Sequence, residues 1–328
     1  MTKKERFIKA INREIVDFIP LMEIEFQIYK EYVGRELTVG KDYEKLSPKE
    51  REAALHQNAD IMIETAEKAG HYAIRDIGGY WETSPGVPAY LWLPTMDDRL
   101  KQIEIIKEKV SNDYFILGST SATMSIPDGN HLYEYSMKLF DAPDEVEREC
   151  AAICKSGVED SLKLIDAGAD GIINASDVAF NTGTFISPEL MDRFFFPFFN
   201  TWASRMKQEN ICSIWHTDGN VNAIIDRVLD SGVDAIQCVD PLAGMDIGKL
   251  VDEHGEQLTF IGNVDCSILH LGSEEDIIRE TNRVLNVCAF KRGFVLCGCN
   301  AIFQGISAEN YQNYIDTKIK FEKNVVLS

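Results

Sequence analysis

Residues that could bind a metal or exchange protons stand at the ends of two short apolar runs. His216 and Asp218 follow the run 211–215, and Cys297 and Cys299 close the run that begins at residue 293. Thiolate, imidazole and carboxylate are the ligands that zinc takes in proteins, and a catalytic zinc site keeps one position open for water or substrate. The two runs therefore predict one shared site at the ends of two strands.

The sequence leaves two interpretations of this site open. In the first, zinc is held by His216, Asp240 and Cys299, with Asp218 or Cys297 as a fourth ligand. The spacing is not that of a paired Cys-x-x-Cys finger. In the second, His216 forms an acid–base pair with Asp218 or Asp240, and the cysteines are small buried apolar side chains.

Eight short β-rich runs alternate with longer helical patterns. They cover residues 18–22, 71–77, 114–118, 170–175, 211–216, 234–239, 258–262 and 293–297. This alternation predicts an α/β fold, a (β/α)8 TIM barrel, whose chemistry gathers at the carboxyl ends of the strands. We expect one domain over residues 1–328, with an N-terminal helical extension across one end and an irregular, aromatic-rich insertion at 78–94, after the second strand.

Polar residues at the strand ends of such a barrel converge although they lie far apart in the sequence. The expected catalytic residues are His216, Asp218 and Asp240. The expected substrate-binding residues are Glu23, Asp76, Tyr80, Trp81, Asp177 and Asn263. An inward Glu23 would suit a general acid whose pKa is raised by burial. The alternative is a carboxylate held by Arg75.

The other cysteines and histidines have the sequence contexts of structural residues. We expect Cys150, Cys154, Cys212, Cys238, Cys266 and Cys288 to be structural, and His56, His71, His131, His254 and His270 to have surface or capping roles. A helix is predicted to begin with Ser187 as N-cap and Pro188 in its first turn. The phenylalanine cluster at 194–199 that follows is typical of core or of a subunit contact.

The composition excludes several classes of partner. The chain has 53 acidic and 33 basic residues and a net charge of −20, which opposes binding to nucleic acid or to an anionic membrane. No apolar stretch approaches the roughly 20 residues that span a bilayer. Eight scattered cysteines and no apolar signal segment favour a reducing, cytoplasmic location.

Several motifs together resemble the uroporphyrinogen decarboxylase superfamily over nearly the whole chain. The motifs are the opening residues 2–7 together with residues 17–20, the turn at residues 216–220, the segment at residues 262–265, and Gly298-Cys299 followed by Glu309-Asn310. The resemblance implies a single-domain (β/α)8 barrel. It also implies one of two activities, because the superfamily contains decarboxylases and corrinoid-dependent methyltransferases.

The resemblance favours methyl transfer over decarboxylation. Porphyrinogen decarboxylases carry an arginine-rich stretch after the first strand, whereas here no arginine lies between Arg13 and Arg35, and Glu23 and Glu25 occupy that region. Carboxylates there would repel a polyanionic tetrapyrrole. Decarboxylation of a smaller acid held by Arg75 is a minor alternative.

Superfamily members that methylate thiols carry a His-x-Cys pattern at the fifth strand, an acidic residue at the sixth and a cysteine at the eighth. His216, Asp240 and Cys299 match three of these positions, but Asp218 replaces the first cysteine. An oxygen ligand makes a harder, less thiophilic site. The chain is more similar to the methyltransferase component of O-demethylase systems from anaerobes.

That similarity implies transfer of a methyl group from a methoxylated, aromatic donor to the cobalt of a corrinoid carried by a separate protein. Zinc or a proton donor at His216 would assist the leaving oxygen, and Tyr80 and Trp81 would hold the ring. The alternatives are transfer from a methylated corrinoid to a thiol, and a non-catalytic protein that binds a ligand in the barrel mouth. The resemblance also implies a homodimer, for which the cluster at 194–199 is a candidate surface.

Overall fold

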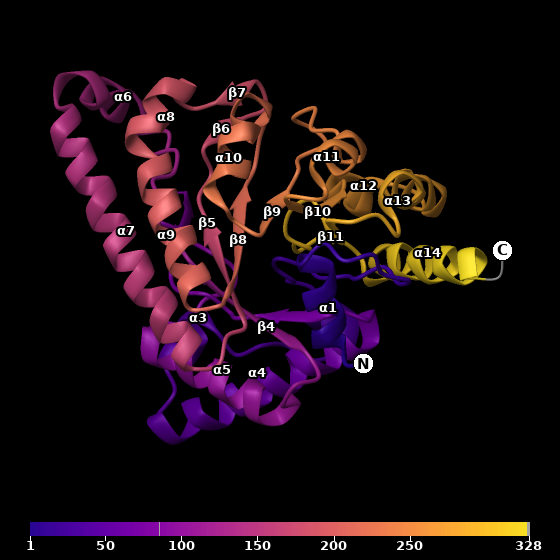
Figure 1. Cartoon of the computed structure of the whole chain (residues 1–328). Coiled ribbons are helices and arrows are strands. Elements are labelled where there is room, and N and C mark those ends of the chain that lie inside the picture. Colours follow the sequence, from indigo (N-terminus) through magenta and orange to yellow (C-terminus); the bar gives the residue numbers. More distant parts are fainter. Residues whose placement is uncertain (85, 327–328) are drawn as a thin grey trace.

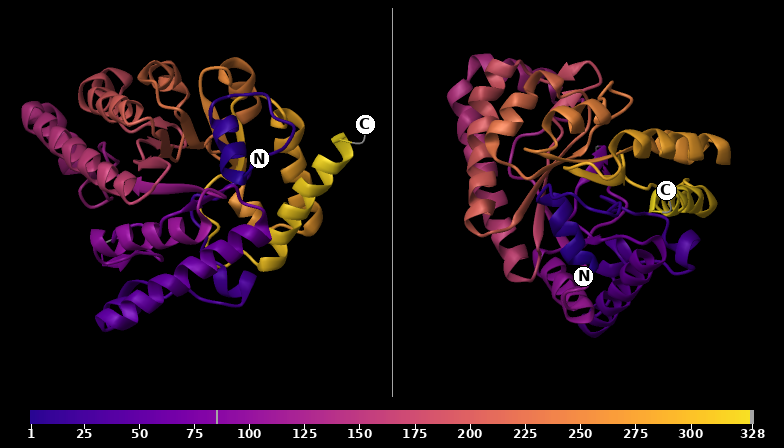
Figure 2. Two further views of the ribbon diagram at one scale, coloured as in Figure 1. Left: turned by 60° about the horizontal axis from the view of Figure 1, so that its bottom comes forward. Right: turned by 45° about the vertical axis from the view of Figure 1, so that its right-hand side comes forward.

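Seven parallel strands form the central sheet of the computed structural model, which describes residues 1–84 and 86–326. In sheet order they are β1 (Ala73–Arg75), β4 (Phe115–Thr120), β5 (Gly171–Ala175), β8 (Cys212–Thr217), β9 (Ala235–Cys238), β10 (Thr259–Val264) and β11 (Phe294–Gly298). Each lies within or beside a run predicted from the sequence. Helices flank the strands on the outside (Figures 1 and 2), so the fold is the expected α/β, TIM-barrel type.

The prediction of a regular strand at residues 18–22 is wrong. Leu21 forms a single isolated bridge with Leu296. The Leu296 N–H donates to the Pro20 carbonyl at 2.9 Å, and the Tyr72 N–H donates to the Leu21 carbonyl at 2.8 Å. Pro20 has no N–H with which to extend a ladder. The segment nevertheless connects β11 to β1 and so closes the ring of strands.

Four helices precede β1, and the others alternate with the later strands and cover the sheet. They are α1 (Lys3–Ile11), α2 (Tyr29–Val33), α3 (Gly40–Glu44), α4 (Pro48–Ala69), α5 (Met96–Val110), α6 (Leu132–Asp141), α7 (Pro143–Asp166), α8 (Pro188–Phe194), α9 (Phe196–Gln208), η1 (Asn222–Ile224), α10 (Ile225–Ser231), α11 (Ile247–His254), α12 (Cys266–Leu271), α13 (Glu274–Cys288) and α14 (Ala308–Val326). In the part of the chain that the structure describes, none of these helices has the length and apolar composition needed to cross a membrane.

The predicted N-terminal cap is present as α1, which lies across the amino ends of the strands. Lys4 Nζ binds Asp170 Oδ1 at 2.6 Å just before β5. The Thr259 hydroxyl, at the start of β10, donates to the Ile11 carbonyl at 3.0 Å. The opposite end of the ring is thereby left for the polar residues at the carboxyl ends of the strands.

Two small hairpins lie outside the central sheet. The predicted insertion contains the antiparallel pair β2 (Glu82–Ser84) and β3 (Val87–Pro88). A second pair, β6 (Ala179–Phe180) and β7 (Gly183–Thr184), follows β5 and was not expected from the sequence.

The phenylalanine cluster is core. Helix α8 begins as predicted, with the Ser187 hydroxyl accepting from the Leu190 N–H at 3.3 Å. Phe195 and Phe199 are fully buried and pack against Trp215 at ring-centroid distances of 5.5 and 5.3 Å. The cluster therefore packs mainly within the chain, with Phe198 half-buried, and its role in a homodimer stays a prediction.

Gly157 allows α7 to lie directly on the loop after β4. A Cβ at this position would be 2.5 Å from Ala122 Cα and 2.6 Å from the Ser121 carbonyl oxygen. Gly157→Ala is therefore expected to lower the free energy of unfolding by about 2 kcal/mol, although alanine in a helix interior normally adds about 1 kcal/mol relative to glycine. Urea denaturation measures the change. Gly129→Ala, whose Cβ would meet no atom within 4 Å, is the control, and stabilisation by Gly157→Ala would contradict the close approach.

Candidate functional site

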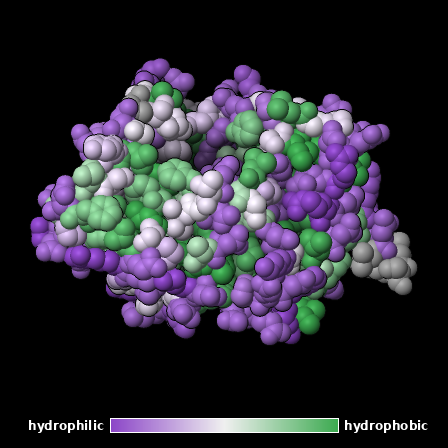
Figure 3. Space-filling view, turned by 90° about the horizontal axis from the view of Figure 1, so that it is seen from above, coloured by the Kyte–Doolittle hydropathy of each residue, from purple (hydrophilic) through white to green (hydrophobic). Residues whose placement is uncertain are grey.

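His216 lies at the centre of a polar cluster at the carboxyl end of β8. Its Nε2 is 3.9 Å from Asp177 Oδ1 and 3.9 Å from Asp218 Oδ1. One ligand atom from each of these three residues lies within 4.8 Å of the other two. The register of the sheet explains the cluster, because β5 pairs Ala175 with His216 and Asp177 follows two residues later. Figure 3 views the molecule from this side and shows a hollow in its surface.

The two carboxylates differ in their surroundings. Asp177 is exposed, and its Oδ1 accepts a hydrogen bond from the Asp218 N–H at 2.9 Å. Asp218 Oδ2 accepts from Asn300 Nδ2 at 2.8 Å. Within the described residues, Asp218 Oδ1 is buried and has no hydrogen-bond partner. Burial raises the pKa of Asp218 above its ordinary value; His216 opposes this shift and Asp177 adds to it.

The loop that carries Asp218 rests on the β6–β7 hairpin. Gly219 has φ +85°, and a Cβ there would lie 2.4 Å from the Ala179 carbonyl oxygen, so the turn requires glycine. The Asn220 N–H donates to the Phe180 carbonyl at 2.9 Å. Phe180, with 46% of its surface exposed, is thus an aromatic side chain on the hairpin next to the cluster. Sequence reasoning missed it because the hairpin was not predicted.

The second ring nitrogen of His216 contacts a residue that sequence reasoning also missed. His216 Nδ1 lies 2.5 Å from Gln237 Oε1. Gln237 is fully buried in β9, and its Nε2 donates to the Gly298 carbonyl at 3.3 Å and approaches Cys297 Sγ at 3.6 Å. An amide inside the apolar strand 235–238 was the available signal, since buried polar groups need partners.

The other predicted metal ligands lie outside the close cluster. Among the described residues, the 4.8 Å group contains neither Asp240 nor either predicted cysteine. Asp240 Oδ1 accepts from the Leu242 N–H at 2.9 Å within its own turn. Cys297 is buried, with its Sγ 3.5 Å from Glu23 Oε2. Cys299 is buried at the end of β11.

Two cysteines expected to be only structural lie beside the predicted site. Cys238 is buried near Asp218, and burial raises the pKa of its thiol well above the ordinary value. Cys266 lies beside Cys299, and this neighbouring thiol together with burial raises the pKa of the Cys266 thiol well above the ordinary value. Both are therefore neutral thiols at ordinary pH.

Glu23 is the inward carboxylate that the sequence predicted. It is buried, accepts from the Gly298 N–H at 3.0 Å and accepts from the Tyr311 hydroxyl at 3.2 Å. Burial raises its pKa to about 8, although these hydrogen bonds oppose the shift. The alternative, a carboxylate held by Arg75, applies to Glu25 and not to Glu23, because Arg75 Nη1 lies 3.4 Å from Glu25 Oε2. The acid role of Glu23 stays a prediction.

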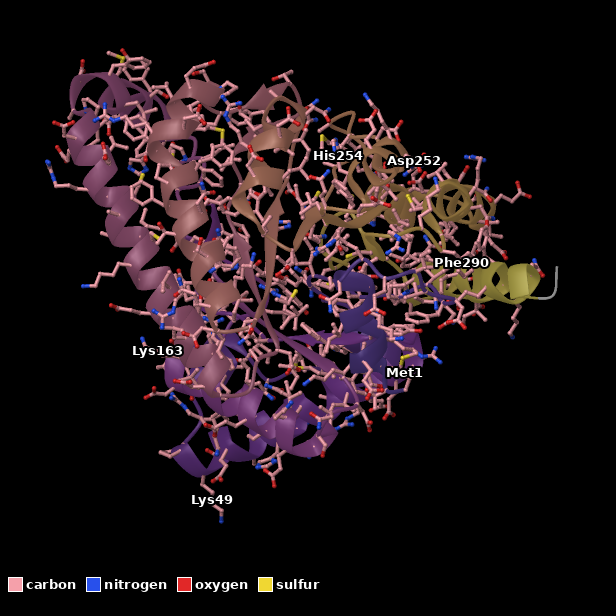
Figure 4. The ribbon with its side chains drawn as sticks, viewed as in Figure 1. Met1, Lys49, Lys163, Asp252, His254 and Phe290 are labelled. Carbon is pink, nitrogen blue, oxygen red and sulfur yellow. The ribbon has the colours of Figure 1, made fainter. Side chains whose placement is uncertain are left out.

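The expectation of a surface or capping role for His71 is wrong. Its ring is buried, Nε2 lies 2.7 Å from the Tyr311 hydroxyl, and burial lowers its pKa to about 3. Other histidines are peripheral: His131 pairs with Asp128 on the surface, and His254 ends α11, outside the ring of strands (Figure 4).

Asp76 and Asn263 are committed to other contacts. Asp76 is buried, accepts from Arg99 Nε at 3.0 Å and accepts from the Ser119 hydroxyl at 3.0 Å. Asn263 is fully buried, and its Nδ2 donates to the Val239 carbonyl at 2.7 Å. The structure therefore places both in the framework around the strand ends, and their substrate-binding roles stay predictions.

Tyr80 and Trp81 lie on the insertion after β1, with 52% and 54% of their surfaces exposed. The Tyr80 ring contacts Trp92 edge-on at 5.0 Å, and its hydroxyl donates to Glu82. In the described part of the chain, neither residue makes a hydrogen bond or ring contact with His216. Their role in holding a substrate ring stays a prediction.

Comparisons with known proteins place the chain in a family. The model described as uroporphyrinogen decarboxylase (URO-D) matches residues 92–320. Methylcobamide:CoM methyltransferase MtbA of Methanosarcina mazei is 25% identical over 221 residues, which cover 66% of this chain and 61% of that protein. Methylcobamide:CoM methyltransferase MtaA of Methanosarcina barkeri is 26% identical over 196 residues, which cover 56% of this chain and 53% of that protein. The chain thus spans little more than half the length of these relatives.

Solved structures share the fold. A methyltransferase from Methanosarcina mazei is 20% identical and has a TM-score of 0.76, covering 98% of this chain and 99% of that one. A B12-independent methionine synthase from Shewanella sp. W3-18-1 is 11% identical and has a TM-score of 0.53, covering 86% and 92%. Because the family model matches residues 92–320, well over half of this chain, the chain belongs to the uroporphyrinogen decarboxylase family.

Proposed function

We propose that this protein is a corrinoid-dependent methyltransferase that works at the His216 cluster. It moves a methyl group between a small substrate and the cobalt of a corrinoid held by a separate protein. The observation that carries this proposal is the convergence of His216 Nε2, Asp177 Oδ1 and Asp218 Oδ1 at the strand ends in a chain of this family. The names of the two methylcobamide:CoM methyltransferases support the same reaction class.

The proposed substrate is a methoxylated, aromatic compound whose methyl group passes to cobalt. The corrinoid supplies the nucleophile, and the departing phenolate oxygen needs a proton or a Lewis acid as the methyl group leaves. His216 and Asp218 are placed to act on that oxygen. Phe180 on the β6–β7 hairpin, and Tyr80 and Trp81 on the insertion after β1, are the aromatic side chains proposed to hold the ring.

The cluster fits a bound cation. Asp218 Oδ1 is a buried carboxylate oxygen without a hydrogen-bond partner among the described residues, and it faces His216 Nε2. A buried acceptor of this kind is costly unless a proton or a metal ion satisfies it. When bound here, zinc would supply a Lewis acid. Asp177 joins His216 and Asp218 as a candidate ligand, whereas Asp240 and Cys299, the other ligands expected from the sequence, lie outside this close group of the described residues.

A second candidate function is methyl transfer from a methylated corrinoid to a thiol. The names of the two similar methylcobamide:CoM methyltransferases favour it, since CoM is a thiol acceptor. The carboxylate at position 218 opposes it, because oxygen ligands make a metal less thiophilic.

One assay panel separates the two functions. The purified protein is incubated with cob(I)alamin and a set of methoxylated aromatics, methanol or methylamines, and separately with methylcobalamin and thiols, while the corrinoid absorption spectrum is recorded. We expect methyl-cobalt formation from a methoxylated aromatic. Demethylation of methylcobalamin by a thiol alone would support the second function. Tight binding of a substrate or corrinoid without turnover in either direction would contradict both and favour a binding protein.

A further inference from the structure

Gln237 connects the proposed site to the interior of the barrel. The side chain is fully buried in β9 between His216 on β8 and Gly298 on β11. One end of its amide contacts His216 Nδ1 at 2.5 Å, and the other end contacts the Gly298 carbonyl at 3.3 Å. The orientation of this amide therefore determines which ring nitrogen of His216 carries the proton.

The Gly298 carbonyl fixes that orientation. A carbonyl oxygen only accepts hydrogen bonds, so the NH2 end of the amide must face it, and Oε1 must face His216. Oε1 is itself only an acceptor, so His216 Nδ1 must be the donor. In the neutral ring the single proton then lies on Nδ1, and Nε2 presents a lone pair.

That lone pair points toward two further acceptors. Asp177 Oδ1 and Asp218 Oδ1 each lie 3.9 Å from Nε2, and the three atoms are within 4.8 Å of one another. Acceptors brought together in a partly dry site repel one another unless a cation lies between them. Asp218 Oδ1 is buried and, within the described residues, has no other partner.

We propose that Gln237 is a positioning residue that holds His216 in its Nδ1–H tautomer, so that His216 Nε2, Asp177 Oδ1 and Asp218 Oδ1 bind a divalent cation. This inference deepens the proposed function and rests on it in one respect only, the location of the site. One nitrogen and two oxygens form a harder site than the thiolate set predicted from the sequence. Such a site binds zinc or cobalt(II) without needing Cys299 and disfavours copper(I).

The tautomer is tested by NMR on metal-free protein labelled with 15N-histidine. His216 is assigned from the signal lost in His216→Ala, and we expect its Nδ1 to be protonated and its Nε2 unprotonated. Gln237→Leu removes the acceptor at similar volume and should move the ring toward the Nε2–H tautomer. Gln237→Glu keeps an oxygen opposite Nδ1 and should restore the wild-type pattern. Gln208→Leu, at an exposed position on α9, is the matched control.

The ligand set is tested by titrating the same proteins with cobalt(II) and zinc. We expect one cobalt ion per chain, with no thiolate-to-metal charge-transfer band, and affinity that is unchanged in Cys299→Ser. Asp177→Asn and Gln237→Leu should each weaken binding by about 10- to 100-fold. Circular dichroism confirms that each variant is folded.

Four results would overturn the inference. They are an Nε2–H tautomer in the wild type, an unchanged tautomer in Gln237→Leu, a charge-transfer band that disappears in Cys299→Ser, and the absence of binding to both cobalt(II) and zinc. Neither readout involves a corrinoid or a methyl donor. A loss of the proposed methyl-transfer function would therefore be seen separately from a failure of this inference.

Discussion

Replacing His216 with alanine is expected to lower the rate of methyl transfer by about a thousandfold. The Nε2 of the imidazole lies 3.9 Å from both carboxylates of the cluster. Without it, the leaving oxygen loses the group proposed to protonate it or to hold its Lewis acid. The rate is measured from the corrinoid absorption spectrum with whichever substrate proves active.

Stability should change far less than the rate. His216→Ala leaves Gln237 Oε1 without its partner, at a cost of about 1–3 kcal/mol, and urea denaturation shows whether the variant remains folded. His131→Ala is the control, because that ring is exposed and pairs only with Asp128. A His216→Ala rate within a few-fold of wild type would show that the cluster is not the reaction site.

The strands could be predicted because their patterns are local. The seven strands of the sheet lie within or beside short apolar runs of the sequence. The segment at 18–22 has the same pattern but pairs through one bridge, since its partners are Leu296 and Tyr72, far away in the sequence. Pro20, which has no N–H, is a local signal against a regular strand there, but nothing local shows that the segment closes a ring of strands with a few hydrogen bonds.

The site could be predicted only to the level of strand ends. The parallel register explains why Asp177 joins His216, and that rule was available from the sequence. It does not say how a side chain turns. Asp240 was predicted to point into the site but accepts from the backbone of its own turn, whereas the overlooked Gln237 reaches His216. Such choices depend on hydrogen-bond partners contributed by distant segments.

Glu23→Gln is expected to remove a large dependence of stability on pH. The pKa of Glu23 is about 8 in the folded protein, against an ordinary value of 4.5. Between these values the folded state holds a proton that the unfolded state has lost, so the free energy of unfolding falls as the pH rises. At about 1.4 kcal/mol per unit, the full effect is at most about 5 kcal/mol above pH 8. Glutamine has no proton to lose, so the variant should be more stable than wild type at high pH and similar to it near pH 4.5.

The groups that face Glu23 do not titrate in the same window. Burial raises the pKa values of Cys297 and Tyr311 well above their ordinary values, and burial lowers the pKa of His71 to about 3. Urea denaturation between pH 4.5 and 8 would measure the slope. Glu25→Gln, two residues along the same segment and facing Arg75, should keep the wild-type slope because Glu23 is still present. If Glu23→Gln kept that slope as well, Glu23 would have to be ionised in the folded protein, and a general acid would have to be sought elsewhere in the barrel mouth.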